Sequence, residues 1–244
     1  MKSLLKTSLL FLLIFTIHSC TEETSESIIK LEFNHNVDGD ELTLHYGEYL
    51  NDAGNSYDVR KLMYLISDIK LEDNKGNLHQ LKDVHFVRVD ENIGLELDLG
   101  EAIPTGQYTN ITFTFGLDEA DNISNRYLND PFHLAMVWPD MMGGGYHYMK
   151  LEGAYNLEDT TLNFYNTHTG KFMESQRHID YDIPIDLNIA NEDATIMFNM
   201  NINEWYRSPN TYLFEVFDAG IMANDSAQAL LMENGNNVFN VTIE

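Results

Sequence analysis

The stretch Ile111-Thr112-Phe113-Thr114-Phe115 alternates apolar and polar residues with a period of two. Successive side chains of a β-strand point to opposite faces, so this alternation places one face against a core and the other toward solvent. The same period recurs in three further apolar sets: Ile183, Ile185, Leu187 and Ile189; Ile196, Phe198, Met200 and Ile202; Phe239, Val241 and Ile243. The pattern predicts an all-β fold, an antiparallel β-sandwich.

One short helix is expected within this β-fold. It covers Ser226–Glu233, where Asn224 or Asp225 can cap the start and Gly235 can close the end. Pro184 falls inside a strand pattern and cannot donate a backbone hydrogen bond, which favours an edge position for that strand.

Two stretches have neither a strand period nor a helix period. Residues 117–131 are rich in Asp and Asn, and residues 136–145 read Met-Val-Trp-Pro-Asp-Met-Met-Gly-Gly-Gly. Both are predicted to be long loops, and long loops in a compact β-domain often carry function.

The N-terminus has the pattern of a signal peptide. Lys2 and Lys6 precede an unbroken apolar run from Leu9 to Phe15, which is far shorter than the roughly 20 residues that span a bilayer. We therefore expect a signal peptide over residues 1–19, a polar tether over 20–27, and a single β-sandwich domain over 28–244.

Cys20 is the single cysteine of the chain, so an intramolecular disulfide and a cysteine-based zinc or iron–sulfur site are excluded. Ile17-His18-Ser19-Cys20 resembles the lipobox of bacterial lipoproteins, in which the cysteine is acylated. The acidic residues that follow resemble the surface-export signal of some lipoproteins. We expect a protein that is lipid-anchored at Cys20 and displayed at the outer membrane or cell surface.

The chain is strongly acidic, with a formal net charge of −25. This charge disfavours nucleic acid as a partner and favours a metal ion or the basic face of another protein. Calcium is one alternative, because Asp38–Glu41 and Asp118–Asn122 offer hard oxygen ligands on loops.

Enzyme signatures are missing from the sequence. It holds no HExxH helix and no GxSxG elbow, and lipidation would consume the only cysteine nucleophile. We therefore predict a protein that is not an enzyme.

Residue type favours copper among the transition metals. Imidazole suits copper and zinc, while thioether sulfur suits reduced copper. Met136, Met141 and Met142 lie in one loop, and His133 and His147 flank it.

Several stretches together resemble the MbnP-like copper-binding family, in matching order and spacing from about Leu31 to Thr169. They are Tyr64–Ile69, Ile111–Asp118, Trp138, Gly145–Gly153 and His168-Thr169-Gly170. The resemblance implies copper bound through histidines and through an oxidised tryptophan, kynurenine, which a dihaem cytochrome peroxidase-like partner makes.

On this resemblance the metal ligands would be His35, His133 and His168, with Trp138 at the oxidised position. The family stretch usually reads Trp-x-Trp-x-x-Gly-Tyr, whereas here the second tryptophan is absent and Pro-Asp-Met-Met-Gly-Gly-Gly follows Trp138. This departure falls in the stretch on which the oxidised-tryptophan chemistry depends.

A rival hypothesis is a surface adhesion or scaffold module that binds a protein or glycan. Such a module would need a patch of solvent-facing aromatic side chains. The candidates for that patch are Trp138, Tyr146, Tyr148, Trp205 and Tyr206.

The lipid anchor can be tested directly. Cys20→Ala is expected to release the protein from the membrane fraction, because acyl chains at this residue are the expected attachment. Fractionation followed by a high-salt wash checks this, and a variant that stays with the membranes would contradict the lipoprotein hypothesis.

Overall fold

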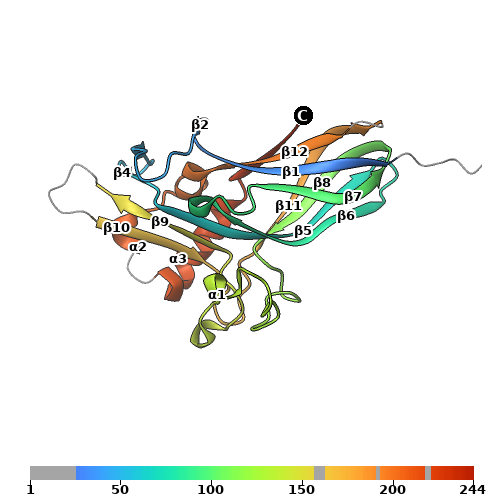
Figure 1. Cartoon of the computed structure of the whole chain (residues 1–244). Helices are drawn as coiled ribbons and strands as arrows, with labels where there is room; N and C mark the ends of the chain where they lie inside the picture. The colour runs from blue at the N-terminus through green and yellow to red at the C-terminus, as the bar shows by residue number, and fades with distance from the viewer. Residues whose placement is uncertain (1–25, 157–162, 191–192, 218–220) are drawn as a thin grey trace, which may run out of the picture.

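The computed structural model describes residues 26–156, 163–190, 193–217 and 221–244, and in this part of the chain it is the predicted all-β sandwich (Figure 1). The signal peptide and Cys20 lie outside the described residues, as does the tether except for Glu26 and Ser27, which begin β1. The strands are β1 (Glu26–Val37), β2 (Asp40–Glu41), β3 (Tyr49–Leu50), β4 (Ser56–Tyr57), β5 (Lys61–Asp73), β6 (Leu78–Arg88), β7 (Glu96–Pro104), β8 (Gly106–Phe115), β9 (Met149–Tyr155), β10 (Asn163–Thr169), β11 (Ile179–Ile189), β12 (Ala194–Asn201) and β13 (Phe239–Ile243).

The helical segments are short. They are η1 (Val89–Glu91), α1 (His133–Met136), η2 (Asp140–Met142), η3 (Ile202–Tyr206), α2 (Phe214–Phe217), η4 (Ile221–Ala223) and α3 (Asp225–Gly235). The helix predicted over 226–233 is confirmed as α3, and the side chain of Asn224 caps it by accepting from the backbone N–H of Ala227. No helix in the described ranges has the length and apolar character needed to cross a membrane.

The first sheet has the order β13-β12-β1-β2, and β7 also pairs with β1. Its strands pair antiparallel except for β1 and β12, which run parallel with Phe33 opposite Phe198. Parallel neighbours need a long crossover connection, and here the whole second sheet lies between the two strands along the chain. Alternation within single strands predicts which face is buried and does not determine strand direction.

The second sheet is organised around β5. It has the order β11-β8-β5-β9-β4-β3, with β6 on the other edge of β5 and β10 on β9. Both β8 and β9 pair with the same edge of β5, β8 alongside residues 66–73 and β9 alongside residues 61–64. The two strands therefore lie end to end, and the chain between them leaves the sheet.

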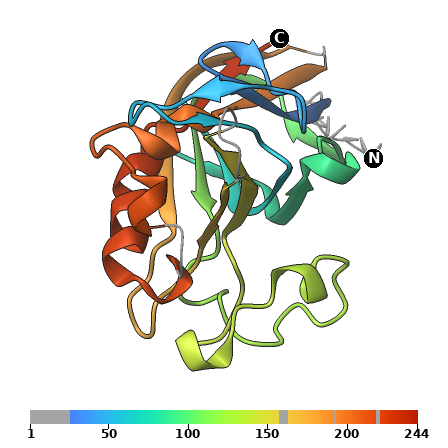
Figure 2. The same ribbon diagram turned by 90° about the vertical axis from the view of Figure 1, so that its left-hand side faces the viewer.

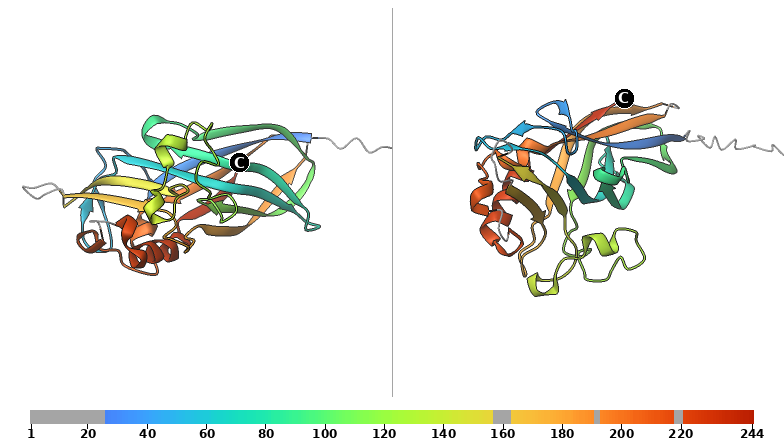
Figure 3. Two further views of the ribbon diagram at one scale, coloured as in Figure 1. Left: turned by 90° about the horizontal axis from the view of Figure 1, so that it is seen from below. Right: turned by 60° about the vertical axis from the view of Figure 1, so that its left-hand side comes forward.

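The strands next to β8 and β9, which are β11 and β10, are also interrupted at this point of the sheet. β10 pairs with β9 and β11 pairs with β8, and residues 170–178 leave the sheet between them. Two insertions, residues 116–148 and residues 170–178, thus begin at one break in the sheet. Figures 2 and 3 show the first insertion, coloured yellow-green, hanging from the sandwich on the side away from the C-terminal strand.

β11 lies at the end of its sheet, so the edge position that Pro184 predicted is confirmed. The register of β11 against β8 shifts between Pro184 and Leu187.

Aromatic rings join the two sheets. Phe198 of β12 stacks on Phe33 with ring centroids 4.9 Å apart and meets Phe113 of β8 at 5.1 Å. The aromatic patch expected for an adhesion module is absent, because all five of its candidate side chains are buried: Trp138, Tyr146, Tyr148, Trp205 and Tyr206. That expectation was wrong because these rings fill the space between the sheets and under the insertions.

His35 gives a prediction for stability against pH. Burial lowers the pKa of His35 from 6.5 to about 4. Below pH 6.5 the unfolded chain binds a proton at this position while the folded chain does not, so stability falls as the pH drops from 6.5 toward 4. At about pH 5 this position should cost about 2 kcal/mol of the unfolding free energy relative to neutral pH.

His35→Gln removes the titration while keeping an amide able to bond the Tyr64 hydroxyl, which lies 3.1 Å from His35 Nε2. Denaturant unfolding at about pH 7.5 and about pH 5 should show a smaller acid loss for this variant than for the parent. Equal losses in the two proteins would contradict a neutral buried His35.

Candidate metal centre

The structure separates the three histidines predicted as ligands. His35 lies on β1 beside the Tyr64 hydroxyl, and His133 begins α1 with its Nδ1 3.0 Å from the Tyr146 hydroxyl. His168 lies on β10. Among the described residues no three His, Cys, Asp or Glu side chains are grouped so that they could hold a metal ion. The three predicted histidines therefore do not form one site in this structure.

His168 has a different imidazole for a neighbour. The ring of His147 lies 5.3 Å from that of His168, centroid to centroid, with an interplanar angle of 83°. His147 lies near the end of the first insertion, two residues before β9, and His168 lies opposite Lys150 in the pairing of β9 with β10. The hairpin register thus brings the start of one strand and the end of the other together.

Trp138 completes this cluster. Its ring meets His147 edge to face at 4.7 Å, and the side chain is fully buried. Its indole Nε1 donates to the backbone carbonyl of Met142 at 3.3 Å. Of the predicted site residues, the structure therefore brings Trp138 and His168 to the same place, through His147.

Gly170 allows the tryptophan to lie there. A Cβ at this position would lie 2.7 Å from the indole Cε3 of Trp138, closer than real Cβ contacts occur. Gly170 begins the second insertion and Trp138 belongs to the first, so the two insertions pack directly against one another at this glycine.

In each imidazole one ring nitrogen is hydrogen-bonded to the protein, and the other remains for a ligand. A carbonyl can only accept, so Nδ1 of His147 donates to the carbonyl of Met136 at 3.2 Å. Its Nε2 is buried and has no hydrogen-bond partner in the part of the chain that the structure describes. His168 donates from Nε2 to Glu152 at 3.0 Å, which leaves its Nδ1 as the nitrogen for a ligand.

The local charges hold His147 neutral. Burial, together with the nearby Lys150 and His168, lowers the pKa of His147 to about 3. The hydrogen bond from His168 and the ion pair with Lys61, against the opposing effect of burial, lower the pKa of Glu152 to about 2. At neutral pH the cluster therefore contains an uncharged imidazole and an ionised carboxylate, the protonation states that metal binding requires.

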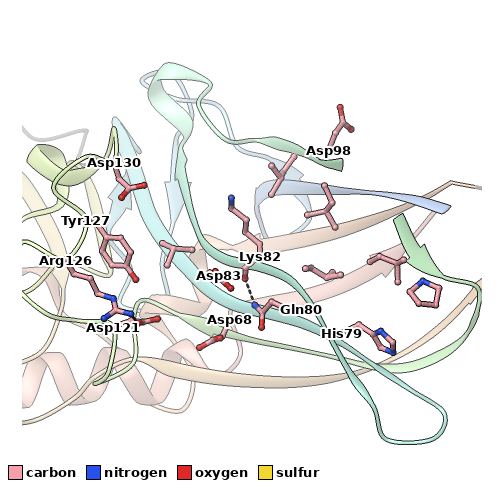
Figure 4. A pocket seen from close by; sticks show the side chains of 16 residues that line it. Asp68, His79, Gln80, Lys82, Asp83, Asp98, Asp121, Arg126, Tyr127 and Asp130 are labelled. Carbon is pink, nitrogen blue, oxygen red and sulfur yellow. Dashed lines mark hydrogen bonds and ion pairs between the residues drawn. The ribbon is translucent and has the colours of Figure 1, made fainter. Parts of the chain in front are cut away.

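A separate groove of about 880 Å³ lies between β6, β7 and the first insertion (Figure 4). Carboxylates line it, and Arg126 pairs with one of them, Asp121, at 2.6 Å. The groove holds neither imidazole of the cluster, so the large concave surface and the paired imidazoles are in different places.

The two loops considered for calcium do not present free oxygen cages. Asp38 is paired with Arg207 at 2.8 Å and accepts from Asn203 at 2.7 Å. The side chain of Asp118 accepts from the backbone N–H of Asp121. These oxygens already serve the protein's own donors.

His147 is the site residue that the sequence-based ligand set omitted. No strand is predicted from sequence over β9 or β10, so no local pattern indicates that His147 and His168 would meet. In the antiparallel hairpin that these strands form, both histidines fall at the same end. The resemblance directed attention to His35 and His133 instead.

Comparison with known proteins gives two findings. A model of the MbnP family matches residues 26–223, which include the whole cluster. Among solved structures, MbnP from Methylosinus trichosporium is similar, with a TM-score of 0.58, 12% sequence identity, and coverage of 89% of this chain and 98% of that one. At this identity the structural likeness shows a shared fold. No curated protein matches this sequence closely enough to count as a relative.

The contact of Gly170 with Trp138 gives a prediction. Gly170→Ala is expected to destabilise the protein by about 1–3 kcal/mol, because the added methyl group overpacks a rigid ring. In a Trp138→Ala background the same change should cost much less, and equilibrium unfolding of the four proteins measures the difference. If the losses of unfolding free energy in the two single variants simply add in the double variant, Gly170 is not needed to make room for the indole of Trp138.

Proposed function

We propose a copper-binding function, without enzymatic activity, for this chain, which belongs to the MbnP family. The ligands in this proposal are His147 and His168, with Trp138 beside them. The observation that carries it is the buried, neutral His147, whose Nε2 has no partner within the described residues and whose ring lies 5.3 Å from a second imidazole.

The donor set fits copper better than the other common cations. Copper(II) binds nitrogen donors most tightly among the divalent first-row metals, and reduced copper accepts imidazole and thioether ligands. Zinc sites need three or four protein ligands, whereas in the part of the chain that the structure describes two imidazoles are close and no group of three potential ligands is found. Calcium needs oxygen ligands, and Glu152 is already bound to Lys61 at 3.0 Å and to His168.

The surrounding residues prepare the two imidazoles. Glu152 accepts from Nε2 of His168 and so orients its ring and fixes its tautomer, as carboxylates do behind metal-bound histidines. The carbonyl of Met136 does the same for His147. Trp138 shields His147 from water, since it is fully buried against that ring.

The proposal includes three features that rest on sequence. They are lipidation at Cys20, display outside the cytoplasm at the outer membrane or cell surface, and oxidation of Trp138 by a dihaem partner. The position of Trp138 beside His147 supports the last, because an oxidised indole there would lie against a proposed ligand.

An adhesion or scaffold function has less support. Its discriminating feature is an exposed aromatic patch, and the five aromatic side chains named for it are buried. No second observation in the described residues favours it.

Copper titration tests the ligand assignment. His147→Asn keeps a donor for the Met136 carbonyl and removes Nε2, and His168→Gln keeps a donor for Glu152 and removes Nδ1. Each variant is expected to lose stoichiometric copper binding, measured by equilibrium dialysis against a competing chelator at low and high salt.

The matched controls are His35→Gln and His133→Gln, which alter the two other histidines predicted from sequence. Both should keep parental binding, and salt should have little effect because His147 is buried and binding through imidazole nitrogen does not depend on exposed charge. If the controls lose copper while His147→Asn retains it, the ligand set proposed here is wrong. If all variants bind alike and salt abolishes binding, copper is held only by the acidic surface.

A further inference from the structure

We propose that Met141, Met142 and Met173 form an entry site for reduced copper at the mouth of the His147–His168 pair. This inference rests on the proposed function and extends it, because it assigns a second, soft-ligand site and a route by which the metal reaches the imidazoles.

The three methionines come from the two insertions and meet at their contact. The backbone N–H of Met173, in the second insertion, donates to the carbonyl of Met142 at 2.9 Å. That same carbonyl accepts from the indole of Trp138 at 3.3 Å. One backbone atom therefore joins the methionine group to the ring that covers His147.

Exposure sets these methionines apart. Met141 is 78% exposed and Met173 is 51% exposed, and they are the two exposed methionines of the described chain. Met142 between them is half-buried. A methionine that fills a core is buried, as Met136, Met149 and Met200 are here. Core packing therefore does not account for these two exposed methionines, which lie on two insertions that are in contact.

The backbone is shaped to bring the insertions together. Met173 has a φ of 52°, a left-handed conformation that residues other than glycine rarely adopt. Gly143 has a φ of 110°, and a Cβ there would lie 2.7 Å from the carbonyl oxygen of Met173. Met142 and Met173 are thus held close by two unusual backbone positions, one on each insertion.

The chemistry selects the cation. Thioether sulfur is a soft, uncharged ligand that prefers reduced copper to the hard cations that an acidic surface attracts. The three side chains are flexible, so they can adjust around a weakly held ion and release it. Entry would then proceed from Met141 and Met173 to Met142, past Trp138, to His147.

Silver(I) is a suitable probe because it is a soft, redox-inert stand-in for reduced copper. The parent is expected to bind one tight and one weaker equivalent in native mass spectrometry. Substituting all three methionines, Met141→Leu, Met142→Leu and Met173→Leu, conserves volume and should abolish only the weaker equivalent. Stopped-flow transfer from a chromogenic chelator should slow by about tenfold or more, with an unchanged affinity for the tight ion.

The control is Met197→Leu with Met232→Leu, two half-buried methionines on β12 and α3, which should behave as the parent. Parental stoichiometry and rate in the triple variant would overturn the entry site while leaving the histidine pair intact. Conversely, if His147→Asn retains the tight equivalent and the triple variant loses it, the methionines are a site and the proposed histidine ligands are wrong. A parent that binds no silver would overturn both.

Discussion

Leu65, in β5, bonds through its backbone N–H and carbonyl to two segments that are far apart in the sequence, and the position of the imidazole pair depends on this. Its N–H donates to the carbonyl of Tyr148 at 2.9 Å, just before β9, and its carbonyl accepts from Gly116 at 2.8 Å, just after β8. Both bonds use the same edge of β5, so the ladder continues without a gap although the chain between the two partners leaves the sheet. Gly116 is needed there, since a Cβ would lie 2.5 Å from the ring of Tyr148.

When the backbone groups of a strand edge keep their hydrogen bonds on both sides of a break, a long insertion there destabilises the fold little, because no buried N–H or carbonyl loses its partner. The neighbouring strand has its own break between Thr169 and Ile179, and the N–H of Tyr148 donates to the carbonyl of Thr169 where that break begins. Two insertions rooted at one level are forced into contact. That contact places Trp138 against Gly170 and Met142 against Met173, and it places His147 beside His168.

The sequence predicts the parts of this arrangement that depend on local pattern. Alternation in residues 111–115 and 196–202 identifies buried strand faces, Asn224 and Gly235 delimit a helix, and Pro184 indicates an edge. The break at Leu65 has no local signal, because β5 is a continuous apolar strand through it. The parallel pairing of β1 with β12 also depends on the whole topology. For the same reason the sequence identifies His168 and Trp138 and omits His147, whose role depends on where the first insertion returns.

The charge of the chain attracts cations, whereas the ligands of the cluster would select among them. A net charge of −25 raises the local concentration of every cation and distinguishes poorly among them. Selection requires ligands that hard cations do not favour, held away from competing water. His147 meets this requirement because its environment keeps the imidazole neutral, with a pKa of about 3, and leaves Nε2 without a partner among the described residues. An unpaired buried polar atom destabilises the fold by about 1–3 kcal/mol, and binding a metal there would remove that penalty. In the proposed function that metal is copper, which binds imidazole nitrogen strongly.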